Sequence, residues 1–558
     1  MINCRPKSVL CILLLTAVLS LAATLNAAVP ALVVVISIDQ FRADYLERFR
    51  PHFGAGGFNL LLEQGADFVN CHYRQAHTKT APGHAVMLTG VYANINGIIA
   101  NDWIDRRTFE QVGCFGDPAE KIVGLDAAPR TRFPGINDPL LGRSPRKLLV
   151  TTVGDELKLF RGGRPKVIAI SNKDRAAILM GGKLADAAYF MENGVMVSST
   201  YYQPELPGWV RAWNAEGKAA AYFGKVWSRV LPEADYACQG PDDASGEDDK
   251  TSELGRTMPK TVTGGETKAG AKFFEAFENT PFSNEVLADF AKTAIAQENL
   301  GRRPGITDML CVSFSAADHI GHLYGPDSHE VMDNVVRMDR TLEDFFRFLD
   351  QQVGLKRCTI VLTADHGTAP NPEHIHSLNA AVPAGRIDGG QMLASCEAAL
   401  NRAFGALADH GRWLVSYDNS FLLHPGALAE HGVSATAAEV VVRDALLSLD
   451  FVQAAYTRTQ LERGDVRDAL GRQAMMSFNR ERSGDVYFQV KPYFISKVLG
   501  SNHGSPYDYD THVPLVWYGV GVPRGTFTDQ VGVDDLAPTL SRLLGLSAPP
   551  FARGRVLF

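Results

Sequence analysis

The chain has 558 residues, of which 46% are hydrophobic and 21% are charged, and its formal net charge at pH 7 is −7. This length supports a large hydrophobic core in one main domain that carries sizeable insertions. The mild acidity and the lack of a cluster of lysines and arginines exclude a dedicated nucleic-acid surface, so we expect no nucleic acid partner.

Residues 1–28 have the layout of a secretory signal peptide. Arg5 and Lys7 precede an apolar run from Val9 to Ala23, and two small alanines end the segment. The alternative is a membrane anchor, but the run is short against the roughly 20 residues that span a bilayer. We therefore expect export with cleavage, a periplasmic or secreted location, and no stable membrane anchor afterwards.

Five short apolar runs rich in β-branched side chains predict buried strands. They span residues 31–39, 166–171, 309–315, 358–363 and 513–518. Helical periodicity lies between several of them, most clearly from Glu330 to Val353. Strands that alternate with helices predict an α/β fold, with a mostly parallel central sheet flanked by helices.

Two stretches interrupt this alternation, at about residues 190–285 and 371–498. The first is rich in aromatic, glycine and polar residues, and the second has mixed patterns without a ligand-rich motif. We interpret both as insertions in a catalytic domain of residues 29–558, where they cover or shape the pocket as cap segments.

Six cysteines lie in the expected mature chain. In an oxidising compartment some of them could pair, but their spacing leaves the pairing open. Two fall in predicted core strands and are expected to be buried thiols, Cys311 and Cys358. The others are Cys71, Cys114, Cys238 and Cys396.

Acidic and histidine residues occur where predicted strands end. Each motif alone also matches a loop turn or a capping aspartate. Carboxylates and imidazoles gathered at the carboxyl ends of parallel strands are, however, what a hydrolytic two-metal centre needs. The residues are Asp39 after the first strand, Asp318 and His322 after the third, Asp365 and His366 after the fourth, and His503 before the last.

The last ligand could be either of two histidines, because His503 and His512 both precede the final strand. We favour His503, since the glycine that follows it lets this loop approach a site closely.

The segment from Thr78 to His84, with the sequence TKTAPGH, offers a hydroxyl nucleophile at Thr78 or Thr80. A threonine hydroxyl needs a cation to become an alkoxide at neutral pH. The alternative is that either threonine only caps the helix that follows. The local sequence does not decide between the two roles.

Two further motifs bear on the substrate. Asn101 lies in an Asn-Asp pair, which alone is typical of a turn. Lys173 and Arg175 follow a predicted strand, and two cations at i and i+2 on extended chain would point to one side and clamp a phosphate dianion. A diester lacks the second charge, so such a clamp favours monoesters. A solvated loop is the alternative reading.

As a set, these motifs resemble the alkaline phosphatase superfamily. The resemblance is to the branch of periplasmic alkaline phosphatases with a threonine nucleophile, close to the nucleotide pyrophosphatases/phosphodiesterases, and it runs from about residue 30 to the end of the fold. It implies Thr80 as the nucleophile and two zinc ions per chain. It assigns one zinc to Asp318, His322 and His503, and the other to Asp39, Asp365, His366 and Thr80.

The same resemblance implies that Asn101 donates a hydrogen bond to a phosphoryl oxygen, and that Lys173 and Arg175 form the cationic pair of monoesterases. We therefore expect hydrolysis of small phosphorylated substrates, namely phosphate monoesters, through a phospho-threonine. The nearest alternative is a phosphodiesterase or nucleotide pyrophosphatase that uses the same site. A secreted binding protein without catalysis is a more distant one. The mixed Asp/His ligand set favours zinc over calcium or magnesium.

Overall fold

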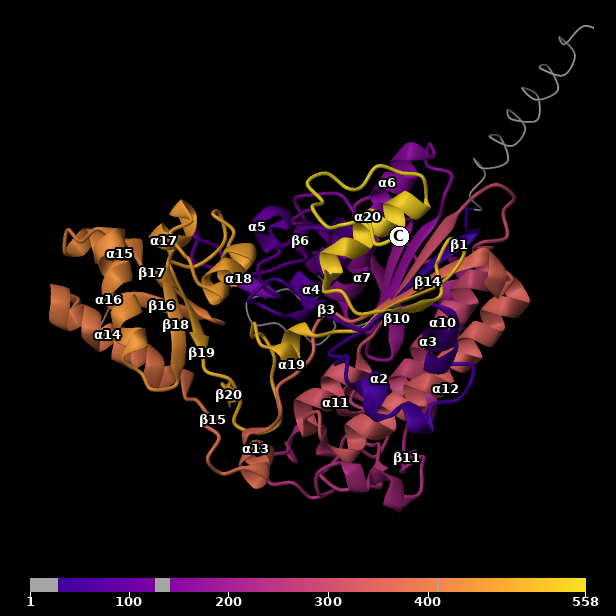
Figure 1. Ribbon diagram of the computed structural model, residues 1–558, viewed down its shortest axis with the longest axis horizontal. Helices are drawn as coiled ribbons and strands as arrows, with labels where there is room; N and C mark the ends of the chain where they lie inside the picture. Colours follow the sequence, from indigo (N-terminus) through magenta and orange to yellow (C-terminus); the bar gives the residue numbers. More distant parts are fainter. Residues whose placement is uncertain (1–28, 126–140, 409–410) are drawn as a thin grey trace, which may run out of the picture.

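The computed structural model describes residues 29–125, 141–408 and 411–558, and the predicted signal peptide lies outside them. Figure 1 shows a large part built around a central sheet, and a smaller part, coloured orange, that stands beside it. Both parts combine helices and strands, as the predicted α/β class requires.

An 11-stranded sheet forms the centre, in the order β22-β2-β21-β14-β1-β13-β8-β9-β10-β6-β7. Its five middle strands pair in parallel, whereas β21 and β10 join them antiparallel. The middle strands are β14 (Cys358–Thr363), β1 (Leu32–Ile38), β13 (Asp308–Phe314), β8 (Val167–Ser171) and β9 (Ala187–Glu192). The outer strands are β22 (Gly525–Phe527), β2 (Ala66–Phe68), β21 (Leu515–Gly519), β10 (Val195–Ser199), β6 (Gly116–Val123) and β7 (Leu141–Arg143).

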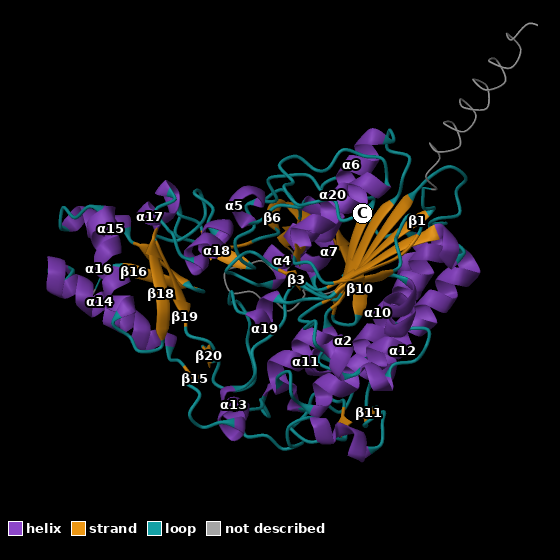
Figure 2. Ribbon diagram, viewed as in Figure 1, coloured by secondary structure: helices purple, strands orange, loops and turns teal. Residues whose placement is uncertain are grey.

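Helices cover both faces of this sheet (Figure 2). Every residue of β1 is buried, because its unbroken apolar run meets helices on both sides. One layer consists of α4 (Thr80–Thr89), α6 (Val153–Phe160), α7 (Asp174–Gly181) and α20 (Leu536–Leu543). The other contains α3 (Phe58–Gln64), α10 (Phe282–Gln297) and α12 (His329–Gln352), the helix predicted from Glu330 to Val353.

The predicted boundary of the first insertion, near residue 190, falls inside the central sheet. Strands β9 and β10 form a hairpin there, and its turn residues Asn193 and Gly194 both have positive φ, at 49° and 78°. The segment that leaves the sheet therefore starts after β10. It contains α8 (Gly208–Ala215), β11 (Val226–Trp227), β12 (Lys260–Thr261) and α9 (Ala271–Glu278).

The second insertion folds around a core of its own. We call residues 385–495 the cap domain. Its four-stranded sheet, in the order β16-β17-β19-β18, packs with helices around buried residues such as Cys396, Trp413 and Phe421. Its main elements are α14 (Gly389–Phe404), β16 (Leu414–Tyr417), β17 (Ser420–Leu423), α15 (Pro425–Glu430), α16 (Ala435–Leu447), β18 (Val452–Thr457), α17 (Arg458–Arg463), α18 (Ala469–Ser477) and β19 (Val486–Val490).

The chain enters and leaves the cap domain side by side. The short strands β15 (Gly385–Arg386) and β20 (Phe494–Ile495) pair with each other. Nearer the central sheet, the amide of Ala369 donates to the carbonyl of Asn502 at 3.1 Å. The helix α13 (Pro372–Leu378) lies between Ala369 and β15 in the chain.

The six cysteines of the described residues are all unpaired, and only Cys238 is exposed. Cys311 and Cys358 are buried in β13 and β14, as predicted. Among the helices that the structure describes, none has the length and apolar character needed to cross a membrane.

Candidate metal centre and nucleophile

The predicted site residues gather at one edge of the central sheet. Asp39 directly follows β1, and Asp365 follows β14 by two residues. Asp318 lies in the first turn of α11 (Ala316–Tyr324), which begins just after β13. Because β1, β13 and β14 run in parallel, their carboxyl ends bring these three carboxylates together.

Two groups of ligand atoms form there, and His366 belongs to both. Asp39, Asp365 and His366 offer atoms that all lie within 4.8 Å of one another, and so do Asp318, His366 and His503. His322 adjoins the second group, with Nε2 at 3.3 Å from Oδ1 of Asp318. The structure thus brings together all six residues that the resemblance assigned to the metal ions.

The donor atoms of the first group fit a bound cation. Oδ1 of Asp39, Oδ2 of Asp365 and Nε2 of His366 are buried, and none has a hydrogen-bond partner within the described residues. The imidazole nitrogen lies 3.5 Å from Asp39 Oδ1 and 3.4 Å from Asp365 Oδ2. Burial, and then the nearby Asp365 carboxylate, raises the pKa of Asp39 well above its usual value. A divalent metal ion would remove this electrostatic cost.

The three imidazoles are oriented to bind metal through Nε2. Each uses Nδ1 to donate to a backbone carbonyl, which leaves the Nε2 lone pair facing the carboxylates. Burial lowers the pKa of all three, to about 4 for His322, so each is the neutral base that a metal needs. The Nδ1 atoms lie at hydrogen-bond distance from backbone carbonyl oxygens: His322 from Ser501 at 3.0 Å, His366 from Gly367 at 2.9 Å, and His503 from Thr78 at 2.7 Å.

His512 does not belong to this centre. Its Nε2 lies 2.9 Å from the carbonyl of Val69, and its ring stacks on His72 at 4.5 Å. The geometry therefore favours His503 as the last ligand.

Thr80 is the first residue of α4 and is buried beside the centre. Thr78 donates its hydroxyl to the carbonyl of Ser505 at 2.8 Å, so that hydroxyl holds the loop of His503 in place. Oδ1 of Asn101 accepts the amide of Ala81 at 2.9 Å, which leaves the side-chain amide nitrogen of Asn101 to donate. Because the Thr78 hydroxyl is engaged in this way, Thr80 remains the candidate nucleophile.

The argument that placed Lys173 and Arg175 on extended chain is wrong. Asp174 already begins α7, so Lys173 is the N-cap residue and Arg175 lies in the first helical turn. The Lys173 ammonium lies between the two metal groups instead. It contacts Oδ2 of Asp39 at 2.6 Å and also Oδ2 of Asp318.

Two residues of the site carried no role in the sequence interpretation. Gln40 donates from its backbone amide to Asp365 at 3.0 Å and from its side chain to Asp318 at 2.8 Å. It does so with a φ of 62°, and no sequence pattern signals such a backbone. His84 lies one helical turn after Thr80, with Nδ1 at 2.8 Å from the Thr80 carbonyl and 3.2 Å from Oδ2 of Asp365. Its position four residues after Thr80 indicates that the two side chains share one face of the helix, and this could have been seen in the sequence.

A central α/β sheet with paired Asp/His groups beside a helix-start threonine defines a phosphoester hydrolase of the alkaline phosphatase type. The chain belongs to the type I phosphodiesterase / nucleotide pyrophosphatase family, whose family model matches residues 33–492.

Relatives and a solved structure agree with this family. The alkaline phosphatase PhoV of Synechococcus elongatus is 33% identical over 540 residues, which cover 95% of this chain and 92% of that one. A protein of Myroides odoratus named calcium-transporting ATPase is 33% identical over 529 residues, covering 93% and 92%. The crystal structure of alkaline phosphatase PafA superposes with a TM-score of 0.86 at 29% identity, covering 95% and 98%. The predicted superfamily and fold are confirmed.

Proposed function

We propose that this protein is an alkaline phosphatase that hydrolyses phosphate monoesters through a phospho-threonine at Thr80. The observation that carries the proposal is the convergence of two Asp/His groups, one of them with buried and unpartnered ligand atoms, near the start of α4, where Thr80 is the first residue. The likeness to proteins named alkaline phosphatase over nearly the whole chain supports it.

The donor set supports two zinc ions per chain. Mixed carboxylate and imidazole ligands are more nitrogen-rich than calcium or magnesium sites. Asp39, Asp365 and His366 would hold one ion with Thr80, and Asp318, His322 and His503 the other. When bound, two such ions polarise the phosphoryl group and lower the pKa of a hydroxyl and of a water molecule.

Thr80 supplies the attacking oxygen, and three other side chains bind the phosphoryl oxygens. The Thr80 oxygen forms a bond to phosphorus as the ester oxygen leaves with the alcohol, and water later cleaves the phospho-threonine to release phosphate. Asn101 donates from its amide nitrogen to a phosphoryl oxygen. If Asp39 and Asp318 held metal ions, the Lys173 ammonium would be free to pair with phosphate oxygens together with Arg175.

Substitution of Thr80 tests the covalent route. Thr80→Ala should lose turnover of a phosphate monoester by at least about a thousandfold, because the attacking oxygen is gone. Thr80→Ser keeps a hydroxyl and should retain turnover. Phosphate release and bound zinc are measured on the same samples. Turnover by Thr80→Ala with its zinc retained would contradict the mechanism.

Lys173→Ala separates the monoesterase from the alternative phosphodiesterase. A monoester presents a second negative charge that the ammonium neutralises, and a diester does not. We expect kcat/KM to fall about tenfold more for an aryl monoester than for the matched aryl diester. Equal losses on the two substrates would contradict this role.

We further propose that the protein is exported and works in the periplasm or outside the cell. The charge and apolar pattern of residues 1–28 supports this. N-terminal sequencing of protein recovered from the periplasmic and culture fractions tests it, since export with cleavage predicts a mature start near residue 29. An intact Met1 terminus in the cytoplasmic fraction alone would contradict it.

A further inference from the structure

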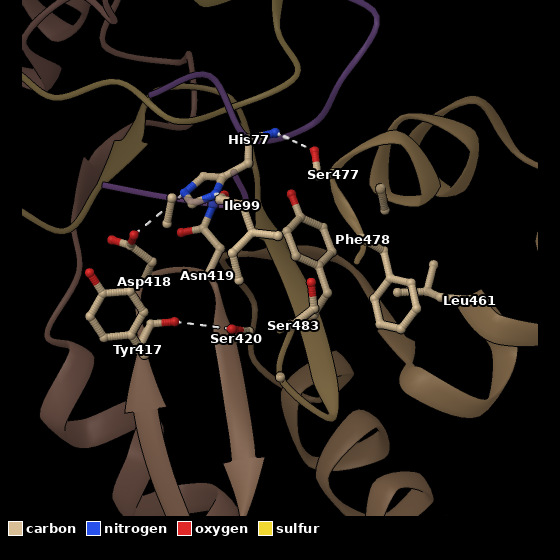
Figure 3. Close-up of a pocket in the computed structure, with 14 residues that line it drawn as sticks. His77, Ile99, Tyr417, Asp418, Asn419, Ser420, Leu461, Ser477, Phe478 and Ser483 are labelled. Atoms are coloured by element: carbon tan, nitrogen blue, oxygen red, sulfur yellow. Dashed lines mark hydrogen bonds and ion pairs between the residues drawn. The ribbon is translucent and has the colours of Figure 1, made fainter. Parts of the chain in front are cut away.

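A pocket is lined by residues of the cap domain and of the main domain (Figure 3). The empty space within it, counted together with the open solvent at its mouth, is about 470 Å³. The main domain lines it with His77, Ile99 and Ala100. His77 comes three residues before Thr80, and Ala100 comes directly before Asn101.

The cap domain forms the other walls, and they are largely apolar. Tyr417, Phe478 and Tyr487 present aromatic rings, and Leu461 and Ala474 add aliphatic surface. Figure 3 shows Phe478 and Leu461 on one side of the pocket, and Tyr417 with Asp418 on another. Walls of this composition bind flat apolar groups well.

The turn between β16 and β17 fixes this pocket relative to the site. Oδ1 of Asp418 lies 3.5 Å from the ammonium of Lys79, the residue before Thr80. Asn419 donates from its side chain to the carbonyl of Gly504 at 3.1 Å, and Gly504 follows His503. One turn of the cap domain thus contacts the neighbours of both the nucleophile and a metal ligand.

One polar atom of the pocket lacks a partner. The side chain of His77 is 9% exposed, and its Nδ1 donates to the carbonyl of Ile99 at 2.8 Å. Its Nε2 has no hydrogen-bond partner among the described residues, and Oδ2 of Asp418 is 3.6 Å away. Burial lowers the pKa of His77, so the ring is neutral near pH 7 and Nε2 is an acceptor. Two acceptors that face each other in a pocket need a donor between them.

We propose that this pocket binds the alcohol part of the phosphate monoester, and that the preferred alcohols carry an aromatic ring with an N–H or O–H donor. The inference rests on the proposed monoesterase function and adds the substrate class to it. The ring lies between the aromatic side chains of the cap domain, and the donor faces Nε2 of His77 and the Asp418 carboxylate.

Three phosphates of primary alcohols test the proposal in the wild-type, zinc-loaded protein. Ethyl phosphate has no ring, 2-phenylethyl phosphate adds a ring, and 2-(indol-3-yl)ethyl phosphate adds a ring with an N–H. Their leaving groups are alike, so differences in kcat/KM report recognition of the alcohol. We expect kcat/KM to rise about tenfold with the ring and to rise again with the donor.

Two variants test whether the aromatic ring and its hydrogen-bond donor bind in this pocket. Phe478→Ala should reduce the ratio of kcat/KM for phenylethyl over ethyl phosphate about tenfold, because the ring loses one wall. His77→Phe should bring the ratio of indolylethyl over phenylethyl phosphate to near one, because the acceptor is gone. Leu447→Ala is the matched control, since Leu447 is a cap-domain leucine that is 49% exposed and outside the pocket, and both ratios should match the wild type.

The possible failures are distinguishable. Equal kcat/KM for all three phosphates in the wild type would overturn the pocket assignment and leave the monoesterase function standing. A preference for rings that Phe478→Ala does not reduce would place the ring elsewhere and also overturn it. Hydrolysis of none of the three phosphates would overturn the proposed function itself. The wild-type series decides the first and last outcomes even where a variant fails to fold.

Discussion

Gln40 connects the two metal groups through the residue that follows β1. Its backbone amide holds Asp365 of one group, and its side chain holds Asp318 of the other. Hydrogen bonds to ligand carboxylates fix their direction and so raise metal affinity. The side chain of Gln40 therefore acts as a positioning residue for Asp318.

We expect Gln40→Ala to weaken zinc binding by about ten- to a hundredfold, because Asp318 loses its oriented donor. Competition with a chelator measures the affinity without use of turnover. Gln489→Ala is a matched control, since Gln489 is an equally buried glutamine in β19 of the cap domain. Zinc affinity equal to the wild type in Gln40→Ala would refute this positioning role.

Asp510 organises the loop that carries His503. Its Oδ2 accepts the amides of Gly504 at 3.0 Å and Ser505 at 2.7 Å. Burial raises its pKa to about 7. Because the folded-state pKa is raised, the stability that protonated Asp510 contributes is complete below the unfolded pKa and is lost as pH rises through about 7.

Asp510→Asn should remove this part of the pH dependence, since an amide does not titrate. Thermal unfolding of both proteins, measured in excess chelator from about pH 5 to pH 8, gives the test. The Tm of the wild type should fall relative to the variant as pH rises. Parallel Tm profiles would show that Asp510 does not titrate in this range.

The convergence of the candidate ligands was predictable in part from local sequence, because Asp39 and Asp365 follow recognisable strands, whereas His503 lies in a loop and was assigned through the family resemblance. Gln40 was not predictable, since its role depends on a positive φ and on a partner 278 residues away. The extended geometry expected for Lys173 and Arg175 failed because α7 begins between them. A helix that starts immediately after a strand leaves little signal in so short a motif.

At the scale of elements, the turn between β16 and β17 holds the nucleophile segment from outside the central sheet. The Asp418 carboxylate, from this turn, pairs with Lys79 directly before α4. We expect Asp418→Ala to lower kcat/KM for ethyl phosphate about tenfold with zinc content unchanged, because a small displacement of an attacking group is costly.

The control for this variant is Asp444→Ala. Asp444 lies on α16 of the same domain, its side chain is 59% exposed, and its ion pair is with the neighbouring Arg443. Its kcat/KM should match the wild type. A fall of the same size in both variants would mean that the turn has no particular role.

The strands of the central sheet were predictable, and those of the cap domain were not. Runs such as Leu32–Ile38 are buried at every position and apolar at all but Ser37, because helices cover both faces. The cap strand Val452–Thr457 mixes exposed and buried positions, and its register with β19 shifts at a bulge. That irregularity hid the second sheet. The pair Asn193-Gly194 is the sequence typical of a two-residue hairpin turn, and the sequence interpretation did not use it.

At the scale of the whole molecule, the two hydrophobic cores differ in their dependence on metal. The main core packs against buried Asp39, Asp318 and Asp365, whereas the cap core contains no such cluster among the described residues. A metal ion bound at this cluster would stabilise the folded main domain by mass action, by about 4 kcal/mol at a thousandfold excess over Kd. Removal of metal should therefore destabilise the main core and leave the stability of the cap core unchanged.

Hydrogen exchange with and without chelator measures this difference. Amides of β1, β13 and β14 should lose protection when zinc is removed and regain it when zinc is restored. Amides of β17 and β19 should keep theirs. Loss of protection of equal size in both sheets would show that the two cores unfold together.

The cap domain departs from the metal centre and returns to it at one place. Ala369 and Asn502 are hydrogen-bonded there, and they lie three residues from His366 and one residue from His503, respectively. An inserted domain whose two ends lie close together can be replaced by another, because the replacement does not have to distort the main domain in order to connect them. The cap domain could thus be exchanged for another domain in one recombination event, and the Asp/His site of the main domain would be unchanged.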